Sequence, residues 1–164
     1  MLIPANTEML LFRFNNYRKH SFIKQHLSVL EEYGYVWMLK VGKRSSVEKI
    51  QSIIKCGGWL VLRSPKADGS ICYLAKFSEI SEEEPIDPVY PEYYNEILDG
   101  EEDDADYYNP NAVYQWFKLE KIRELSEEAA ENLVISKTGK KVNDVIGTTR
   151  TAVMFVRNGK QITF

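Results

Sequence analysis

The chain has 164 residues, of which 44% are hydrophobic, so it is long enough for a single domain with an apolar core and is not a disordered chain. Its formal net charge of −3 hides three unlike regions: residues 1–66 carry 11 Lys and Arg against 4 Asp and Glu, residues 67–109 carry 1 against 14, and residues 110–164 carry 9 against 6. The chain has no run of ~18 apolar residues and no basic-then-apolar leader, so we expect no membrane span and no signal peptide, and a cytoplasmic protein with free thiols at Cys56 and Cys72.

The first part of the chain predicts two strands, each followed by a helix. Ser21 is a plausible helix N-cap and Gly34 a plausible helix end, and Ser45-Ser46-Val47-Glu48 has the capping-box pattern, with Gly57-Gly58 ending the second helix. The predicted elements are a strand at Glu8–Phe14, a helix at His20–Tyr33, a strand at Tyr35–Val41 and a helix containing Val47, Ile50, Ile53 and Ile54.

The rest of the chain predicts more strands and turns. We expect a hairpin of Trp59–Arg63 and Ile71–Ile80, a strand at Val113–Ile122, a short helix at Ser126–Leu133, and a hairpin of Thr149–Arg157 and Lys160–Phe164. In that last hairpin, Asn158-Gly159 is typical of a type I′ turn. These elements predict an α+β fold: one small, mixed, mainly antiparallel β pseudobarrel over residues 1–164, with two or three flanking helices.

An acidic stretch interrupts this pattern. Residues 81–108 contain 12 acidic residues, five tyrosines and three prolines but no lysine or arginine, which predicts a long loop or insertion. The stretch is either a solvated insertion or a surface that presents carboxylates and tyrosines to a basic partner protein. The sequence from Asp99 to Asp104 lacks the alternating acidic spacing of a calcium loop.

Signatures of catalysis, cofactors and metals are absent from the sequence. There is no glycine-rich phosphate loop and no Gly-x-Ser-x-Gly nucleophile elbow. His20 and His26 are six residues apart, which places them on different faces of a helix and disfavours a metal site. The carboxylates cluster in the stretch that looks least rigid, whereas a catalytic pair needs fixed geometry. We therefore expect no enzyme, no cofactor and no bound metal.

The N-terminal part combines cations with aromatic residues. Lys40, Lys43 and Arg44 follow the second predicted strand, and Arg63 ends the third. Nucleic acids are bound by cations that contact phosphates and by flat apolar rings that stack on bases, and Trp37, Trp59 and Trp116 lie within predicted strands. Scattered surface lysines and core tryptophans would give the same composition, so both interpretations stay open.

Four segments resemble the PUA-like superfamily, and within it EVE-type domains. They are Gly34–Lys43, Gly58–Ser64, Tyr73–Ile80 and Val113–Leu119, and the resemblance covers residues ~8–155. It implies a pseudobarrel that binds DNA or RNA and holds a modified base in an aromatic pocket. By position, Trp37, Lys40 and Ser45 would border that pocket, and Trp116 would come from the later strand.

The sequence thus predicts a non-catalytic nucleic-acid-binding domain, with Trp37, Lys40, Arg44, Ser45, Arg63 and Trp116 as candidate contacts. The alternative is a protein-interaction module or inhibitor that engages a basic partner through residues 81–108.

Overall fold

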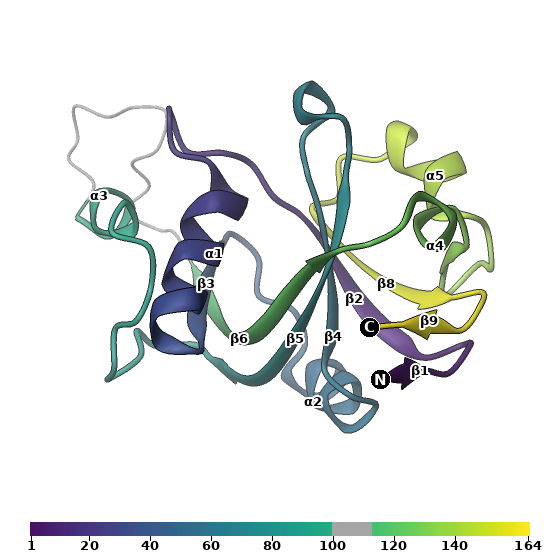
Figure 1. Ribbon diagram of the computed structural model, residues 1–164, viewed down its shortest axis with the longest axis horizontal. Coiled ribbons are helices and arrows are strands. Elements are labelled where there is room, and N and C mark those ends of the chain that lie inside the picture. The colour runs from purple at the N-terminus through teal and green to yellow at the C-terminus, as the bar shows by residue number, and fades with distance from the viewer. Residues whose placement is uncertain (100–112) are drawn as a thin grey trace. The chain divides into compact units, whose positions relative to one another are not determined.

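The computed structural model describes residues 1–99 and 113–164, and it has an α+β fold (Figure 1). The strands are β1 (Leu2–Ile3), β2 (Glu8–Arg13), β3 (Val36–Val41), β4 (Trp59–Arg63), β5 (Cys72–Ser81), β6 (Tyr114–Glu124), β7 (Leu133–Ile135), β8 (Val153–Asn158) and β9 (Ile162–Thr163). The helices are α1 (Phe22–Tyr33), α2 (Val47–Lys55), α3 (Tyr94–Leu98), α4 (Glu127–Glu131) and α5 (Val142–Val145), with short 3₁₀ turns η1 (Lys66–Asp68) and η2 (Ile146–Thr148).

Seven strands form one sheet in the order β3-β6-β5-β4-β2-β8-β7, and β1 pairs with β9 separately. The pairing is mostly antiparallel, with β2 and β4 running parallel. This confirms the predicted α+β class and the mainly antiparallel sheet. Among the described residues, the two terminal strands of the order do not pair, so the pseudobarrel-like sheet remains open.

The first predicted helix start agrees with the cap that forms, and the second is one residue early. The Ser21 side chain accepts a hydrogen bond from the Lys24 amide, and Gly34 ends α1 with a φ of 81°, a left-handed conformation that glycine adopts without strain. Helix α2 begins one residue later than the capping-box pattern suggests, because Ser46 and not Ser45 accepts from the Lys49 amide. That shift leaves Ser45 in the preceding loop, where its side chain can serve another purpose.

The chain divides into two compact units, which are described separately. Unit 1 comprises Met1–Asn15, Ser46–Phe77 and Lys121–Phe164, and unit 2 comprises Asn16–Ser45 and Ser78–Glu120. The charge divides along the same boundary: unit 1 carries 14 Lys and Arg against 8 Asp and Glu, and unit 2 carries 7 against 16. Unit 1 therefore has a net charge of +6 and unit 2 of −9, so any anion-binding role favours unit 1 as a whole and only local sites in unit 2.

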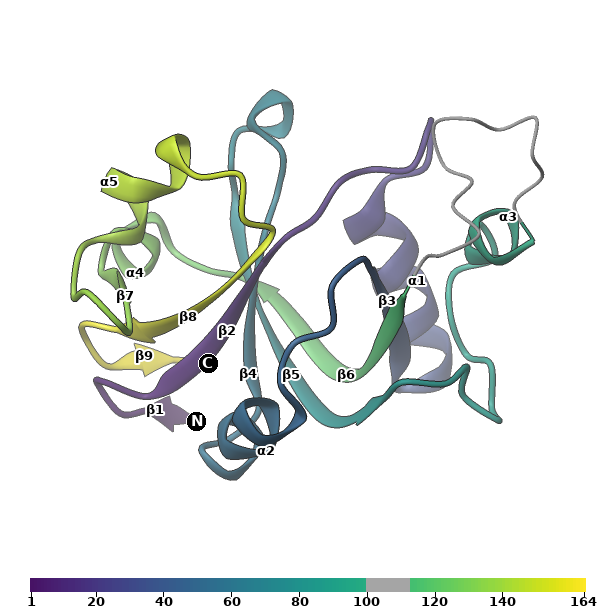
Figure 2. The ribbon, with the colours of Figure 1, turned by 180° about the vertical axis from the view of Figure 1, so that it is seen from behind.

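Unit 1 is built around the parallel pair β2–β4, in which Leu10 is opposite Leu60. Helix α5 packs against β7 in this unit (Figure 2). The apolar core of this unit includes Met9, Leu11, Val61, Leu74, Leu133 and Val156. Gly58 is required at the start of β4, because a Cβ there would lie 2.1 Å from the carbonyl oxygen of Phe77.

Unit 2 has an aromatic core between helices and the β3–β6 pair. Helix α1 lies beside β3 in both views (Figures 1 and 2). The buried members of the core are Tyr17, Trp37, Leu39, Tyr93, Tyr94 and Trp116. Two of these tyrosines belong to the stretch at 81–108, so the part of the predicted loop up to residue 99 includes α3 and packs into the core. Residues 100–108 of that prediction lie outside the described residues.

The predicted hairpin at the C-terminus is wrong. Strand β9 pairs with β1 and not with β8, and neither Asn158 nor Gly159 has the positive φ of a type I′ turn. The Asn158 side chain instead bridges the chain termini: it accepts from the Thr7 amide at 2.8 Å and donates to the Pro4 carbonyl at 2.9 Å. Gly159 is needed for a different reason, because a Cβ there would lie 2.7 Å from the carbonyl oxygen of Asn132.

Candidate nucleic-acid interface

The structure places the predicted contacts of β3 and β6 on opposite faces of this strand pair. Lys40 is opposite Gln115, and Leu39 is opposite Trp116. Successive side chains of a strand point to opposite faces. Trp37 and Trp116 therefore share one face, and Lys40 lies on the other, so the tryptophans and the lysine do not form a single pocket on this strand pair.

The tryptophan face is closed by tyrosines. Trp116 exposes 1% of its surface and Trp37 exposes 7%. The Trp116 ring centroid lies 5.4 Å from that of Tyr90 and 6.1 Å from that of Tyr94. Trp116 is thus a core residue of the folded protein, and a base could stack on it only if Tyr90 and Tyr94 moved away.

A chain of buried hydrogen bonds holds Tyr94 in this core. The amide of Leu39 donates to the Tyr94 hydroxyl oxygen at 3.1 Å, and that hydroxyl lies 2.5 Å from Nε2 of His26. Nδ1 of His26 lies 2.7 Å from the carbonyl oxygen of Phe22, which can only accept, so Nδ1 carries the proton and Nε2 accepts from Tyr94. Burial lowers the pKa of His26 to about 4 and raises the pKa of Tyr94, so both groups are neutral near pH 7.

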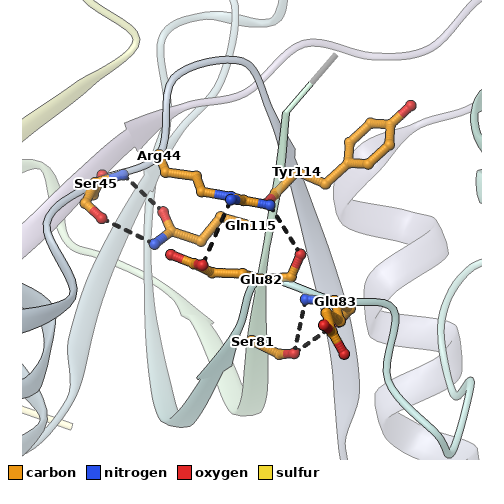
Figure 3. Close-up of polar contacts among 7 residues, drawn as sticks. All are labelled: Arg44, Ser45, Ser81, Glu82, Glu83, Tyr114 and Gln115. Carbon is orange, nitrogen blue, oxygen red and sulfur yellow. Dashed lines mark hydrogen bonds and ion pairs between the residues drawn. The ribbon is translucent and has the colours of Figure 1, made fainter. Parts of the chain in front are cut away.

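The opposite face holds a polar cluster around Lys40. Its ammonium group donates to the Lys43 carbonyl, to Ser45 Oγ at 3.0 Å and to Gln115 Oε1 at 3.4 Å. Gln115 also pairs with the backbone of Ser45 in both directions, since its Oε1 accepts from the Ser45 amide at 2.9 Å and its Nε2 donates to the Ser45 carbonyl at 3.1 Å (Figure 3). Lys40 exposes 5% of its surface, and burial lowers its pKa to about 8. We refer to Lys40, Ser45 and Gln115 as the lysine cluster.

Arg44 extends from the same loop toward the acidic stretch. Its Nε donates to the Tyr114 carbonyl at 2.9 Å, and its guanidinium contacts the carbonyl and carboxylate oxygens of Glu82 at 3.2 and 3.5 Å (Figure 3). A turn just after β5 positions Glu82: the Ser81 hydroxyl donates to the Glu83 carbonyl at 2.7 Å and accepts from the Glu83 amide at 3.2 Å. The acidic stretch therefore already supplies one anionic partner to a predicted phosphate contact.

An acidic hollow of about 470 Å³ lies on the tryptophan face of unit 2. Its walls include two aromatic residues and four carboxylates: Tyr35, Trp37, Glu79, Glu83, Glu84 and Asp87. Lys118 also lines the hollow, with its ammonium nitrogen 4.7 Å from the Tyr35 ring centroid and 3.7 Å from Glu79 Oε1. The hollow thus combines rings and carboxylates in the way that favours a cationic group.

Arg63 belongs to unit 1, where it neighbours another arginine. It is opposite Arg13 across the parallel strands β4 and β2. One guanidinium nitrogen of Arg63 donates to Asn143 Oδ1 at 2.9 Å, and one of Arg13 donates to the Thr149 carbonyl at 2.8 Å. In the described part of the chain, neither arginine forms an ion pair with a carboxylate.

Three residues at these sites were absent from the sequence predictions. Gln115 is the polar residue inside an otherwise apolar strand segment, a pattern that signals a buried hydrogen-bonding role. Tyr94 sits among Tyr93, Asn95, Glu96 and Ile97, a short helical pattern that the acidic composition obscured. Glu82 contacts a residue 38 positions earlier, which no local pattern can reveal.

Comparisons with known proteins identify no family for this chain. No protein family, no curated protein and no solved structure matches this chain. The resemblance to EVE-type domains therefore stays a prediction. Within residues 1–99 and 113–164, no helix is long and apolar enough to cross a membrane, and no group of three or more histidine, cysteine or acidic side chains could hold a metal ion.

The buried His26 predicts an acid-sensitive stability. Its pKa is about 4 in the folded chain, against 6.5 for an exposed imidazole, so between those pH values the unfolded chain binds a proton that the folded chain does not. The free energy of unfolding should therefore fall by up to about 3 kcal/mol as the pH drops from 6.5 to 4. We expect His26→Gln to flatten this decline in chemical denaturation, measured against His20→Gln as the control. An unchanged pH dependence in His26→Gln would contradict the assignment.

Proposed function

We propose that the protein is a non-catalytic nucleic-acid-binding domain and that Arg44 and Ser45, in the loop after β3, contact a phosphate while the buried ammonium of Lys40 supplies positive charge beneath them. The observation that carries this proposal is the ammonium of Lys40. It is buried among three neutral oxygen atoms, and no carboxylate in the described part of the chain pairs with it. A buried cation without a counter-charge is costly, and a bound anion offsets that cost.

The geometry around Lys40 supports binding at the exposed loop that follows β3. Arg44 is exposed and Ser45 half-buried, whereas Lys40 lies beneath them. The double hydrogen bond between Gln115 and the Ser45 backbone fixes this loop, so little conformational entropy would be lost when a phosphate binds. Phosphate contacts of this kind supply sequence-independent, salt-sensitive affinity.

The resemblance to EVE-type domains implies recognition of a base. In this structure the base would stack on Trp37. Trp37 lines the acidic hollow, whereas Trp116 is enclosed by tyrosines. Carboxylates such as those of the hollow can accept hydrogen bonds from the amino groups of cytosine and similar bases. A flipped base costs a few kcal/mol to unstack, and stacking on one ring returns ~1–3 kcal/mol. Stacking on Trp37 would therefore at most offset the cost of unstacking the base, and it would set the preference for a base while the phosphate contact supplies the affinity.

Glu82 competes directly with a phosphate for Arg44. Its carboxylate lies 3.5 Å from the guanidinium, in the position that a phosphate oxygen would take. Both side chains are partly exposed, so this ion pair contributes little stability and can exchange for another anion. We therefore expect Glu82 to lower the affinity of this loop for nucleic acid.

The exchange at Arg44 predicts opposite effects for two substitutions. Glu82→Gln should tighten binding of short single-stranded DNA or RNA about threefold or more, because it removes the competing carboxylate, and Arg44→Gln should weaken it about tenfold. Fluorescence anisotropy at low and moderate salt would measure both changes.

A matched control for Glu82→Gln is Glu128→Gln, which removes the same charge and also breaks an exposed ion pair, the one with Lys160. Parent-like affinity in Arg44→Gln, or no binding of any oligonucleotide, would refute the phosphate contact.

The lowered pKa of Lys40 predicts a pH-dependent affinity. A nearby phosphate stabilises the charged amine, so binding should weaken as the pH rises through about 8 and Lys40 loses its proton. Lys40→Met should bind more weakly at neutral pH and lose this dependence, whereas Lys43→Gln should retain it. If Lys40→Met keeps the parental pH profile of oligonucleotide affinity, Lys40 is not the titrating group.

A second candidate function is binding of a basic partner protein, and the acidic hollow is the observation that favours it. Lys118 already places an ammonium against the Tyr35 ring and a hollow carboxylate. An arginine or lysine of a partner would find the same combination of ring and carboxylates beside it.

Point substitutions test this candidate better than a deletion, because Tyr93 and Tyr94 of the acidic stretch are in the core of unit 2. The double variant Glu83→Gln/Glu84→Gln should lose about tenfold in affinity for an arginine-rich peptide. The control is Glu127→Gln/Glu128→Gln on α4, which removes the same charge in unit 1. Equal affinity in the two double variants would exclude the hollow as the peptide site.

A further inference from the structure

Unit 1 contains an apolar hollow that neither proposed function uses. It has a volume of about 630 Å³, within the ~300–1,000 Å³ range of small-molecule sites. Its apolar walls come from α2, β7 and β8, and two lysines stand at its border; these residues are Ile53, Ile135, Met154, Phe155, Lys49 and Lys137. We call it the apolar hollow.

The one carboxylate at the apolar hollow is already engaged. Glu8 Oε2 accepts a hydrogen bond from the Ser136 hydroxyl at 2.7 Å, and Glu8 Oε1 lies 3.8 Å from Nε of Arg157. Glu8 therefore does not neutralise the two lysines, and its negative charge is balanced by Arg157. What remains for a ligand is an apolar surface with positive charge at its border.

The two lysines have no carboxylate partner in the described part of the chain. Lys137 is exposed and forms no ion pair there. The ammonium of Lys49 lies 5.3 Å from the centroid of the Phe155 ring, a cation–π contact worth ~0.5–1 kcal/mol at an exposed site. A charge-assisted hydrogen bond to an anion is stronger than that contact, so Lys49 can turn to a ligand at little cost.

We propose that the apolar hollow binds a small amphipathic anion, an apolar chain or ring that carries one carboxylate or phosphate. The apolar part lies against Ile53, Ile135 and Met154, where it is removed from water. The anionic head meets Lys49 and Lys137. Charge complementarity selects this occupant over a neutral or cationic molecule with the same tail, because only an anion forms charge-assisted hydrogen bonds with the two ammonium groups.

The test compares ligands that share a tail and differ in head group. Decanoate, decyl phosphate, decanol and decyltrimethylammonium would be titrated below their micelle concentrations, with binding followed by calorimetry and by shifts in the NMR signals of the Met154 methyl group. Decanoate, decyl phosphate or both should bind at least about tenfold more tightly than decanol. The stronger of the two acids identifies the head group that the site prefers.

Lysine substitutions then locate the selectivity. Lys49→Gln/Lys137→Gln should reduce the preference for anions to about onefold to twofold while decanol binding stays unchanged. Lys140→Gln/Lys141→Gln removes the same charge from exposed lysines that do not line the apolar hollow, and it should keep the preference. Decanol or the cation binding as tightly as the acids, or no ligand binding at all, would overturn the proposal. Both double variants should keep the parental affinity for oligonucleotides, because the apolar hollow does not include Arg44.

Discussion

The hydroxyl of Tyr94 is the constraint on which unit 2 depends. It receives the amide of Leu39 on β3 and donates to His26 on α1, so one oxygen atom joins a strand, a helix and the acidic stretch. The His26 side chain and the Tyr94 hydroxyl are fully paired only when all three segments are in place. A buried polar group without its partner costs about 1–3 kcal/mol, so loss of any one segment would penalise the other two.

This anchor explains how residues 81–99, despite their negative charge, can pack next to the sheet. Carboxylates repel one another, and a chain segment with net charge alone would remain solvated. Tyr93 and Tyr94 supply buried apolar area that offsets the repulsion, and Tyr90 covers Trp116. Residues 81–94 are held at one end by β5 and at the other by these tyrosines, so Glu82 and the walls of the acidic hollow occupy defined positions.

Most strands and helices could be predicted because each is set by local chemistry. Ser21 and Gly34 delimit α1 through caps, and the apolar run from Trp59 to Leu62 can only be buried as a strand. Asn158-Gly159 failed because a local turn preference was overridden by distant partners: Thr7 and Pro4 hold the asparagine side chain, and the Asn132 carbonyl fills the space beside the glycine. Tyr94 was missed because its role needs His26, 68 residues earlier.

The candidate site was predictable in composition but only partly in arrangement. Lys40, Arg44 and Ser45 are neighbours in sequence, so their proximity follows from the chain itself. Strand alternation also places Trp37 and Lys40 on opposite faces, a consequence that the resemblance to an aromatic pocket concealed. The pairing of Arg44 with Glu82 needs the tertiary fold, because β5, the acidic stretch and β6 must all return to the end of β3.

The net charge of −3 is the sum of +6 on unit 1 and −9 on unit 2. In unit 1 the excess of cations leaves Arg13, Arg63, Lys49 and Lys137 without carboxylate partners among the described residues; their contacts there are to neutral groups. In unit 2 the excess is negative, yet the one buried ammonium among the described residues, that of Lys40, is surrounded by neutral oxygens. The Ser45 hydroxyl and the Gln115 amide oxygen satisfy that amine with neutral acceptors, so the cluster needs no carboxylate, and Glu82, inside the turn that begins at Ser81, pairs with the neighbouring Arg44 instead.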